Sequence, residues 1–160
     1  MEYEAEVYLL SQKFTKDYPI STYPELMCKP GRPYTCLLID SHECYFICVP
    51  FRSSIRHKNS FMFQGTQRSK KNKSGLDYSK MVLISDDDYI DANVKAIVDQ
   101  DEYTEMMRNL PYIVTDVLQY VDIYINHVNG TNGIHPREYD RKYLYSTLPY
   151  FHDIMNLQKQ

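Results

Sequence analysis

Side chains that bind phosphate and transfer protons are concentrated in one part of the chain, between Arg52 and Lys80. This window holds eight lysines or arginines and a single acid, Asp77, which gives it a net charge of +7. The whole chain has a net charge of −3, so the residues outside the window sum to −10. A mildly acidic protein that gathers its positive charge in this way has the electrostatic pattern of a phosphate-backbone binder. A solvated, lysine-rich surface loop is the simpler alternative.

The same window holds groups suited to cutting RNA without a protein nucleophile. In that reaction the ribose 2′-hydroxyl attacks the adjacent phosphate, so an enzyme must remove one proton, supply another to the 5′-oxygen and neutralise the phosphorane. His57 is the candidate base or acid because histidine titrates near neutral pH, although a surface histidine without a role is the alternative. Lys58 or Lys80 is the candidate proton-transfer partner. The groups expected to grip the scissile phosphate are Arg52, Ser53 and Arg56.

Other polar residues are candidates for contacts with RNA away from the scissile phosphate. Asp77 is expected to orient Lys80 or an arginine, or to contact a base edge, with a salt bridge in a turn as the alternative. Ser79 is a candidate phosphate contact, although a serine at a strand edge more often faces solvent. Basic side chains in a polar run predict non-specific backbone contacts that weaken with salt. The remaining candidate RNA contacts are Lys29, Arg32, Tyr34, Ser54, Arg68, Lys70, Lys71 and Lys73.

The sequence indicates neither a metal site nor a cofactor. The four cysteines form no C-x-x-C pair, and His42 alone does not complete a zinc pattern, so we expect reduced thiols in the core. Residues 86–88 are three aspartates without the glycine and alternating oxygen ligands of a calcium loop, which favours a solvated turn. A cysteine-based enzyme is a weak alternative, because Cys44 and Cys48 fall in an apolar run where a thiolate would be poorly solvated.

Length and composition predict one globular domain that covers residues 1–160. A chain of 160 residues with 43% hydrophobic content can bury a single core. No apolar run approaches the roughly 20 residues that a bilayer crossing needs, and the acidic start is unlike a signal peptide. We therefore expect a cytoplasmic protein without a membrane partner.

The first half of the chain predicts mainly strands. Residues 34–40 and 44–51 are two β-forming runs separated by a short polar turn, which predicts a hairpin. Both runs are apolar on both faces, so this hairpin should lie in the middle of a covered sheet. The other predictions here are a strand at 4–10, a short helix at 12–17 capped by Ser11, a loop at 21–33, and strands at 61–63, 80–85 and 94–98. We expect the basic run after residue 63 to be a mobile loop.

The last third of the chain predicts helices. Asp101 is the expected N-cap of a helix at 102–108, and Pro111 the first residue of a long helix that ends near Val128. Valines and tyrosines recur in this long helix at spacings of three and four, which predicts a core-facing stripe. One or two closing helices are expected over residues 139–157, interrupted at Pro149. The predicted fold is α+β: a compact single domain with a twisted, mainly antiparallel sheet of about five or six strands, packed by helices and with long C-terminal helices.

Three segments of the chain resemble a known family. They are VPFRSSIRHK at residues 49–58, GLDYSK at residues 75–80, and the RPY that opens the hairpin at residues 32–34. In these segments the chain resembles the endoribonuclease toxins of type III toxin-antitoxin systems, the ToxN/AbiQ group, and most closely its CptN/TenpN branch. Where the ToxN branch has a Thr-Ser pair followed by a lysine, this chain has Arg52-Ser53 and the run from Arg56 to Lys58. The resemblance supports Ser53 as a site residue and leaves the proton-transfer group open.

The resemblance implies a function and partners. It implies metal-independent, sequence-specific cleavage of cellular mRNA, and inhibition by a small structured antitoxin RNA that the toxin processes from a repetitive transcript. It further implies a closed assembly of protein and RNA, and it matches Arg32, or less well Lys29, to a basic residue before the hairpin. A non-catalytic RNA-binding or ribonucleoprotein assembly module that uses the same basic stripe is the alternative from another class.

Overall fold

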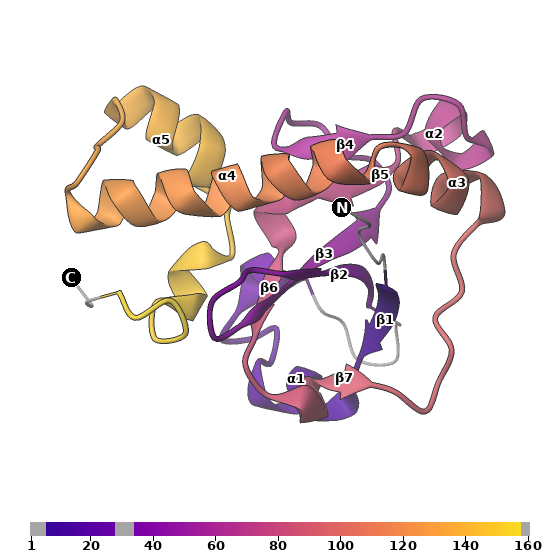
Figure 1. Cartoon of the computed structure of the whole chain (residues 1–160), viewed down its shortest axis with the longest axis horizontal. Helices are drawn as coiled ribbons and strands as arrows, with labels where there is room; N and C mark the ends of the chain where they lie inside the picture. Colours follow the sequence, from indigo (N-terminus) through magenta and orange to yellow (C-terminus); the bar gives the residue numbers. More distant parts are fainter. Residues whose placement is uncertain (1–5, 28–33, 158–160) are drawn as a thin grey trace.

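The computed structural model describes residues 6–27 and 34–157, and within them the chain forms one antiparallel sheet with helices packed around it (Figure 1). Every paired strand runs antiparallel to its neighbour. The strands are β1 (Glu6–Leu10), β2 (Thr35–Asp40), β3 (Phe46–Arg52), β4 (Ser60–Met62), β5 (Gly75–Asp77), β6 (Val82–Ile84) and β7 (Ile90–Asp91). The predicted α+β class is confirmed, with seven strands in the described part of the chain where about five or six were expected.

Short and long helices alternate with these strands. The α-helices are α1 (Gln12–Asp17), α2 (Gln67–Asn72), α3 (Gln100–Arg108), α4 (Leu110–Asn129) and α5 (Pro136–Tyr143). The 3₁₀ turns are η1 (Pro24–Leu26), η2 (Tyr78–Lys80), η3 (Asp87–Tyr89) and η4 (Leu148–Phe151). The side chain of Ser11 accepts a hydrogen bond from the backbone N–H of Phe14, which confirms the predicted cap of α1. The N-cap of α3 is Asp99 rather than the predicted Asp101.

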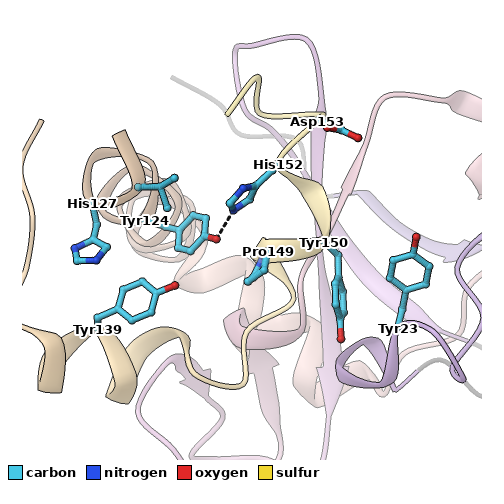
Figure 2. A pocket seen from close by; sticks show the side chains of 9 residues that line it. Tyr23, Tyr124, His127, Tyr139, Pro149, Tyr150, His152 and Asp153 are labelled. Atoms are coloured by element: carbon cyan, nitrogen blue, oxygen red, sulfur yellow. Dashed lines mark hydrogen bonds between the residues drawn. The ribbon is translucent and has the colours of Figure 1, made fainter. Parts of the chain in front are cut away.

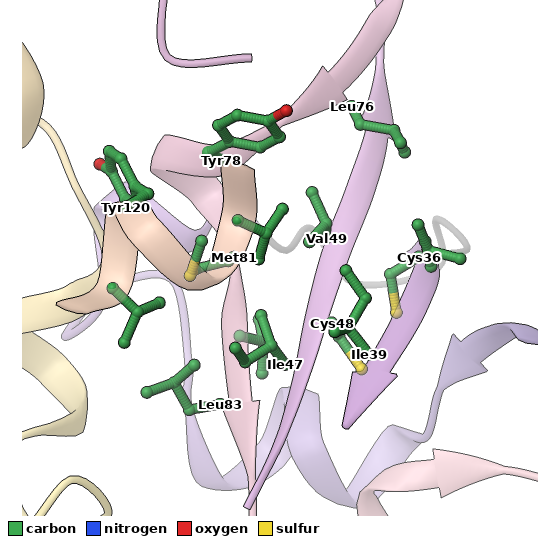
Figure 3. Packing of buried hydrophobic residues seen from close by; sticks show 14 of the residues in the cluster. Cys36, Ile39, Ile47, Cys48, Val49, Leu76, Tyr78, Met81, Leu83 and Tyr120 are labelled. Atoms are coloured by element: carbon green, nitrogen blue, oxygen red, sulfur yellow. The ribbon is translucent and has the colours of Figure 1, made fainter. Parts of the chain in front are cut away.

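Strand β3 is the centre of the sheet, as the hairpin predicted. The strands follow the order β4-β5-β3-β2-β1-β7, and β6 also pairs with β3. Four consecutive β3 residues are buried, from Ile47 to Pro50, so both faces of the strand are covered. Figure 3 shows Ile47 and Val49 on one side of β3 with Met81 and Leu83, and Cys48 on the other side. This burial fixes the end of β3, from which the window of candidate site residues begins.

One edge of β3 pairs with a strand that is interrupted in its middle. Strand β5 pairs with the end of β3 and β6 with its beginning, and the single turn η2 bulges out between them. On this edge Pro50 lies between the two pairings, so its missing N–H interrupts neither of them, while on the other edge it lies in register with Cys36 of β2. Backbone carbonyls of the bulge accept hydrogen bonds from residues outside the sheet. Thr147 N–H donates to Ser79 O at 2.9 Å, and Tyr34 OH donates to Lys80 O at 2.6 Å. The bulge thus holds residues 77–80 in fixed positions beside the end of β3.

Helix α4 spans the sheet and closes the core on one side (Figure 1). Its buried residues follow the predicted spacing of three and four, which confirms the core-facing stripe. They are Leu110, Ile113, Val114, Val117, Tyr120, Val121 and Tyr124. Helix α5 lies near the C-terminal end of α4 and packs through Tyr143, whose hydroxyl donates to the carbonyl of Tyr120 at 2.7 Å.

The strand predicted at residues 94–98 does not form. The strand in this region is the two-residue β7, which pairs with β1, and the chain from Ala92 to Asp99 is irregular. The apolar side chains of the segment point to solvent, with Val94 52% and Ile97 87% exposed. The β-forming composition of this run was not enough to form a strand. β-Propensity largely reflects packing of side chains against neighbouring residues, and these two side chains have little such packing.

We expect Gly75→Ala to lower the free energy of unfolding by about 2–3 kcal/mol, the upper range for overpacking. A Cβ at this position would overlap the backbone carbonyl oxygen of Phe61 and lie 3.1 Å from the Cα of Met62, so strand β4 would have to move. Urea unfolding followed by circular dichroism measures the loss. The matched control is Gly133→Ala, where the nearest atom is 3.8 Å away and a change within about 0.5 kcal/mol is expected. Equal stability of the two variants would show that β4 is free to shift.

Candidate active site

The loop that follows β3 is anchored to the basic helix α2. The backbone N–H of Ser54, a residue with a left-handed φ of 58°, donates to Asn72 O, and that of Ile55 donates to Lys73 O at 3.2 Å. The side chain of Ile55 is buried. These contacts fix the loop at one end and leave Arg56, His57 and Lys58 at its exposed tip.

His57 meets Asp77 and Ser79 beside the bulge. Its Nε2 lies 3.1 Å from Asp77 Oδ1 and 3.3 Å from Ser79 Oγ. Ser79 also donates to Asp77 Oδ1 with its hydroxyl at 2.6 Å and its backbone N–H at 3.0 Å. Asp77 and Ser79 are buried, whereas the His57 side chain is 34% exposed. A buried carboxylate therefore holds a partly exposed imidazole.

The hydrogen bonds of His57 determine where its proton resides. The backbone N–H of Asn59 donates to His57 Nδ1 at 3.1 Å, so Nδ1 carries no proton and the neutral ring is protonated at Nε2, facing Asp77. Burial alone would raise the pKa of Asp77. The hydrogen bonds from His57 and Ser79, with the positive charge of Arg52, outweigh burial and hold that pKa below its ordinary value. Asp77 is consequently an anion at neutral pH, and His57 Nδ1 is the ring nitrogen able to accept a proton.

These three residues do not form a serine-histidine-aspartate triad of the hydrolase type. In such a triad the carboxylate and the serine contact different ring nitrogens, so that the serine loses its proton to the ring. Here Asp77 and Ser79 both face Nε2, and the Ser79 hydroxyl donates to Asp77. Ser79 thus stabilises the carboxylate and is not placed as a nucleophile. Asp77 contacts this histidine and not Lys80, a pairing that the sequence analysis did not predict.

A cationic cleft lies between the His57 loop and the end of α2. Its volume is about 790 Å³. We call it the basic cleft; its described lining consists of Ser54, Ile55, Arg56, His57, Lys58, Met62, Lys71, Asn72 and Lys73. Four of these residues are lysines or arginines, and none of the described lining residues is acidic. The cleft thus brings together, within one concave surface, five of the predicted site residues and His57 itself.

The basic run is a helix, which corrects the predicted mobile loop. Helix α2 begins with a capping box in which Thr66 and Ser69 exchange hydrogen bonds, and it ends at Lys73 in a left-handed conformation. Acidic side chains from α3 hold the first residue of α2 and the two residues before its N-cap. Asp101 accepts from Gln67 N–H at 2.9 Å, and Glu105 accepts from Gln64 and Gly65 N–H groups at 2.9 Å each. The helix is stable because tertiary contacts satisfy its N-terminal donors, although it has no buried apolar residue of its own.

Arg68 is bound inside the protein and does not point freely toward a ligand. Its Nη2 and Nε lie 2.9 Å and 3.2 Å from the two carboxylate oxygens of Glu102, which is 1% exposed. Ser74 Oγ donates to the same carboxylate at 2.6 Å. The Arg68 side chain is 35% exposed, so this pair joins α2 to α3 at the edge of the core. Lys70, on the same helix, is exposed.

Lys80 also forms an internal ion pair. Its Nζ lies 2.6 Å from Glu25 Oε2 and donates to Tyr145 O at 2.8 Å, and Lys80 is 8% exposed. Tyr34 contacts the carbonyl of the same residue. Arg52 Nη1 donates to Met27 Sδ at 3.0 Å, and Arg52 lowers the pKa of Asp77 by its charge. None of these three predicted site residues is among the described lining of the basic cleft.

The remaining predicted site residues and the cysteines lie elsewhere in the chain. Ser53 is exposed directly before Ser54, at the entrance of the loop. The predicted contacts Lys29 and Arg32 lie outside the described residues, as does Cys28. Of the other cysteines, Cys36 and Cys48 are buried as expected, but Cys44 is exposed, because it lies in the turn before β3 and not in the strand.

Sequence reasoning missed three residues that shape the site. They are Asn59, which fixes the His57 ring, and Glu25 and Glu102, which pair with Lys80 and Arg68. The Thr66-x-x-Ser69 spacing was the one local signal for α2. Glu25 and Glu102 lie 55 and 34 residues from their partners and carried no such signal.

Residues 6–27 and 34–157 contain no cluster of three or more histidine, cysteine or acidic side chains placed to hold a metal ion. In the same part of the chain, no helix combines the length and the apolar character that a membrane crossing requires. The basic cleft and the His57–Asp77 pair form the candidate site. Comparison of the chain with family models, curated proteins and solved structures found no match.

Proposed function

We propose that this protein is an endoribonuclease that cuts RNA by attack of the ribose 2′-hydroxyl on the adjacent phosphate. The products would be 2′,3′-cyclic phosphate and 5′-hydroxyl ends. The observation that carries the proposal is His57, held by a buried carboxylate in the wall of a cleft with four cationic side chains. A base with its orienting anion and a set of phosphate-binding cations are the parts that this reaction requires.

The proton is taken up at His57 Nδ1. In the free protein this atom accepts the Asn59 N–H, and the substrate's 2′-hydroxyl takes that place when RNA binds. As Nδ1 gains the proton, the ring becomes an imidazolium, and Asp77 at 3.1 Å from Nε2 stabilises its charge. Hydrogen bonds of catalytic groups are commonly aligned only once the substrate is bound, so the Asn59 contact is compatible with this role.

The cations of the basic cleft bind the phosphate and supply the second proton. Lys58 follows His57 directly and lines the same cleft, so the proposal assigns it protonation of the leaving 5′-oxygen. Arg56 is suited to bind two phosphoryl oxygens with its planar guanidinium. Lys71 and Lys73 bind neighbouring phosphates of the strand. Lys80, with its buried ion pair to Glu25, is assigned a structural role.

We further propose that the physiological partner is RNA in two forms, cellular mRNA as substrate and a small structured antitoxin RNA as inhibitor. Support comes from the resemblance of residues 49–58 and 75–80 to the type III endoribonuclease toxins. In those systems the toxin processes its own repetitive antitoxin transcript and is held in a closed protein-RNA assembly.

The test is incubation of the purified protein with a long mixed-sequence RNA in excess EDTA, with sequencing of the fragments and analysis of their ends. We expect discrete fragments with 2′,3′-cyclic phosphate termini. A matched incubation with the Lys71→Gln, Lys73→Gln double variant should give the same cut sites at higher RNA concentration, because those lysines bind backbone and do not choose the bond. RNA that remains intact in EDTA but is cut on addition of Mg²⁺ would overturn the proposed mechanism.

A non-catalytic RNA-binding module is the second candidate. The observation that favours it is the Asn59 N–H on His57 Nδ1, which occupies the proposed basic atom in the free protein. In that case the basic cleft binds RNA with a strong dependence on salt, and substitution of His57 leaves binding unchanged.

A further inference from the structure

A second pocket lies away from the basic cleft, at the C-terminal end of α4 (Figure 2). Its volume of about 690 Å³ is within the range of small-molecule sites, roughly 300–1,000 Å³. We call it the aromatic pocket; six of the nine residues of its described lining are tyrosines or histidines. They are Tyr23, Tyr124, His127, Tyr139, Tyr150 and His152. The walls come from η1, α4, α5 and the segment that begins at η4.

The rings of the pocket present flat surfaces to its interior. Tyr139 stacks on His127 with centroids 4.6 Å apart and planes at 26°. Tyr150 packs edge-to-face on Tyr23 with centroids 5.0 Å apart. In Figure 2 the first pair lies on one side of Pro149 and the second on the other. Pro149 lies between the two pairs, so a planar ligand in the pocket can stack on the rings of one pair at a time.

The polar atoms of the pocket suit a neutral ligand. His127 Nδ1 accepts the N–H of Ile134 at 3.0 Å, so the neutral ring has its proton on Nε2. Tyr124 OH and His152 Nε2 are hydrogen-bonded at 2.5 Å, and burial lowers the pKa of His152, which keeps that ring neutral at neutral pH. None of the described lining residues is a lysine or arginine, and one, Asp153, is an acid. The pocket therefore offers stacking faces, hydroxyl and imidazole edges and one carboxylate, but no cation for a phosphate.

We propose that the aromatic pocket binds one unstacked nucleobase of the RNA strand that occupies the basic cleft. Bases of single-stranded RNA are commonly bound by stacking on aromatic rings and by hydrogen bonds to their edges. The inference rests on the proposed function, because it requires that the same RNA strand also binds in the basic cleft. Helix α5 links the two sites, since Tyr139 lines the pocket and the carbonyl of Arg141 accepts from Asn59 Nδ2 at 3.0 Å.

The charge of α5 supports this path for the strand. The three cations of this eight-residue helix, Arg137, Arg141 and Lys142, outnumber its two acids, Glu138 and Asp140, and both arginines are exposed. Backbone phosphates between the cleft and the pocket would meet these cations, while the base enters a pocket that has none. The phosphates of the strand would therefore lie against the cations of α5, and the base would lie in the aromatic pocket.

The experiment uses the five histidines of the chain as reporters in NMR spectra. Each imidazole resonance is assigned by a single substitution, and the protein is titrated with adenosine and uridine monophosphates, with ribose 5-phosphate, and with a short oligonucleotide that lacks 2′-hydroxyls. We expect the nucleotides to shift His127 and His152, and ribose 5-phosphate to shift neither. The oligonucleotide should shift these two and His57 together, at a concentration at least about 10-fold lower than the mononucleotides. His42, in the β2–β3 turn, should remain unchanged.

A matched pair of variants tests the stacking. Tyr139→Leu should weaken oligonucleotide binding by roughly 5- to 100-fold. The control is Tyr112→Leu, because Tyr112 is 63% exposed at the opposite end of α4, and its binding should match that of the unmodified protein.

The outcomes separate the pocket from the proposed function. An oligonucleotide that shifts His57 but neither His127 nor His152 overturns the pocket and leaves the function in place. Mononucleotides that bind as tightly as the oligonucleotide overturn the link to a strand and make the occupant a free nucleotide. Shifts of His127 and His152 without any at His57 contradict the proposed RNA path through the cleft, while the pocket remains a nucleobase site.

Discussion

Replacement of His57 with glutamine is expected to lower the rate of RNA cleavage by roughly 100- to 10,000-fold, the usual contribution of a general acid or base. Glutamine can still donate to Asp77, so the buried carboxylate keeps a partner, but an amide cannot take up the proton of a 2′-hydroxyl. RNA affinity should change little because the four cations of the basic cleft remain. Single-turnover cleavage rates and a separate binding measurement in EDTA distinguish the two effects.

The matched control for this variant is His42→Asn. His42 is exposed in the turn between β2 and β3 at a φ of 62°, a conformation that asparagine tolerates. Cleavage by this control should equal that of the unmodified protein. If His57→Gln cuts at an undiminished rate and remains folded, His57 does not transfer the proton. If neither protein cuts and both bind RNA, the non-catalytic module is the better description.

The elements that the sequence predicted well are those with a local periodic signal. The long helix α4 buries residues at the helical period, and β2 and β3 are short apolar runs of strand length that are buried on both faces. Their predicted bounds agree with the structure within two residues, and the largest difference is the start of β3 at Phe46 in place of residue 44. Tertiary contacts were not needed to recognise them because each has a continuous buried face.

Helix α2 shows why the basic run was not recognised as a helix. Its six residues carry no apolar stripe, and none is buried. The acids that hold it lie on α3, between 34 and 41 residues further along the chain. Sequence patterns report only on contacts within one element. The sequence of a helix that depends on a distant partner for its N-terminal hydrogen bonds therefore resembles that of a loop.

The contacts within the candidate site could not be predicted from local sequence patterns either. His57 and Asp77 were each selected for their chemistry, but the pair was not predicted, because it depends on the bulge η2 between β5 and β6. Lys80 was selected for its charge, and its partner Glu25 lies 55 residues away. Residue type thus identified the candidates, whereas the interruption of one strand determined which of them meet.

Replacement of Arg68 with methionine is expected to lower the free energy of unfolding by about 3 kcal/mol. Removal of one partner from a buried pair costs roughly 3–5 kcal/mol because the other charge is left uncompensated, and the lower end applies here since Arg68 is 35% exposed. Glu102 would keep only the Ser74 hydroxyl among its present side-chain partners. Urea unfolding measures the loss. Lys70→Met, an exposed position on the same helix, should change stability by less than about 0.5 kcal/mol.

A double variant distinguishes two origins of this loss of stability. One is the missing attraction between Arg68 and Glu102, and the other is the cost of leaving the Glu102 carboxylate buried without a cation. If the cost arises from the unpaired carboxylate, then Arg68→Met with Glu102→Met should be more stable than Arg68→Met alone, because apolar side chains of similar volume replace a buried pair at little cost. Part of the loss should remain, since Ser74, fully buried, loses its acceptor. A double variant less stable than Arg68→Met would show that Glu102 stabilises α2 without its arginine. Lys71 lies on the helix that this pair holds and Lys73 is its C-cap, so RNA affinity should follow stability: it should fall in Arg68→Met and recover in the double variant where stability recovers.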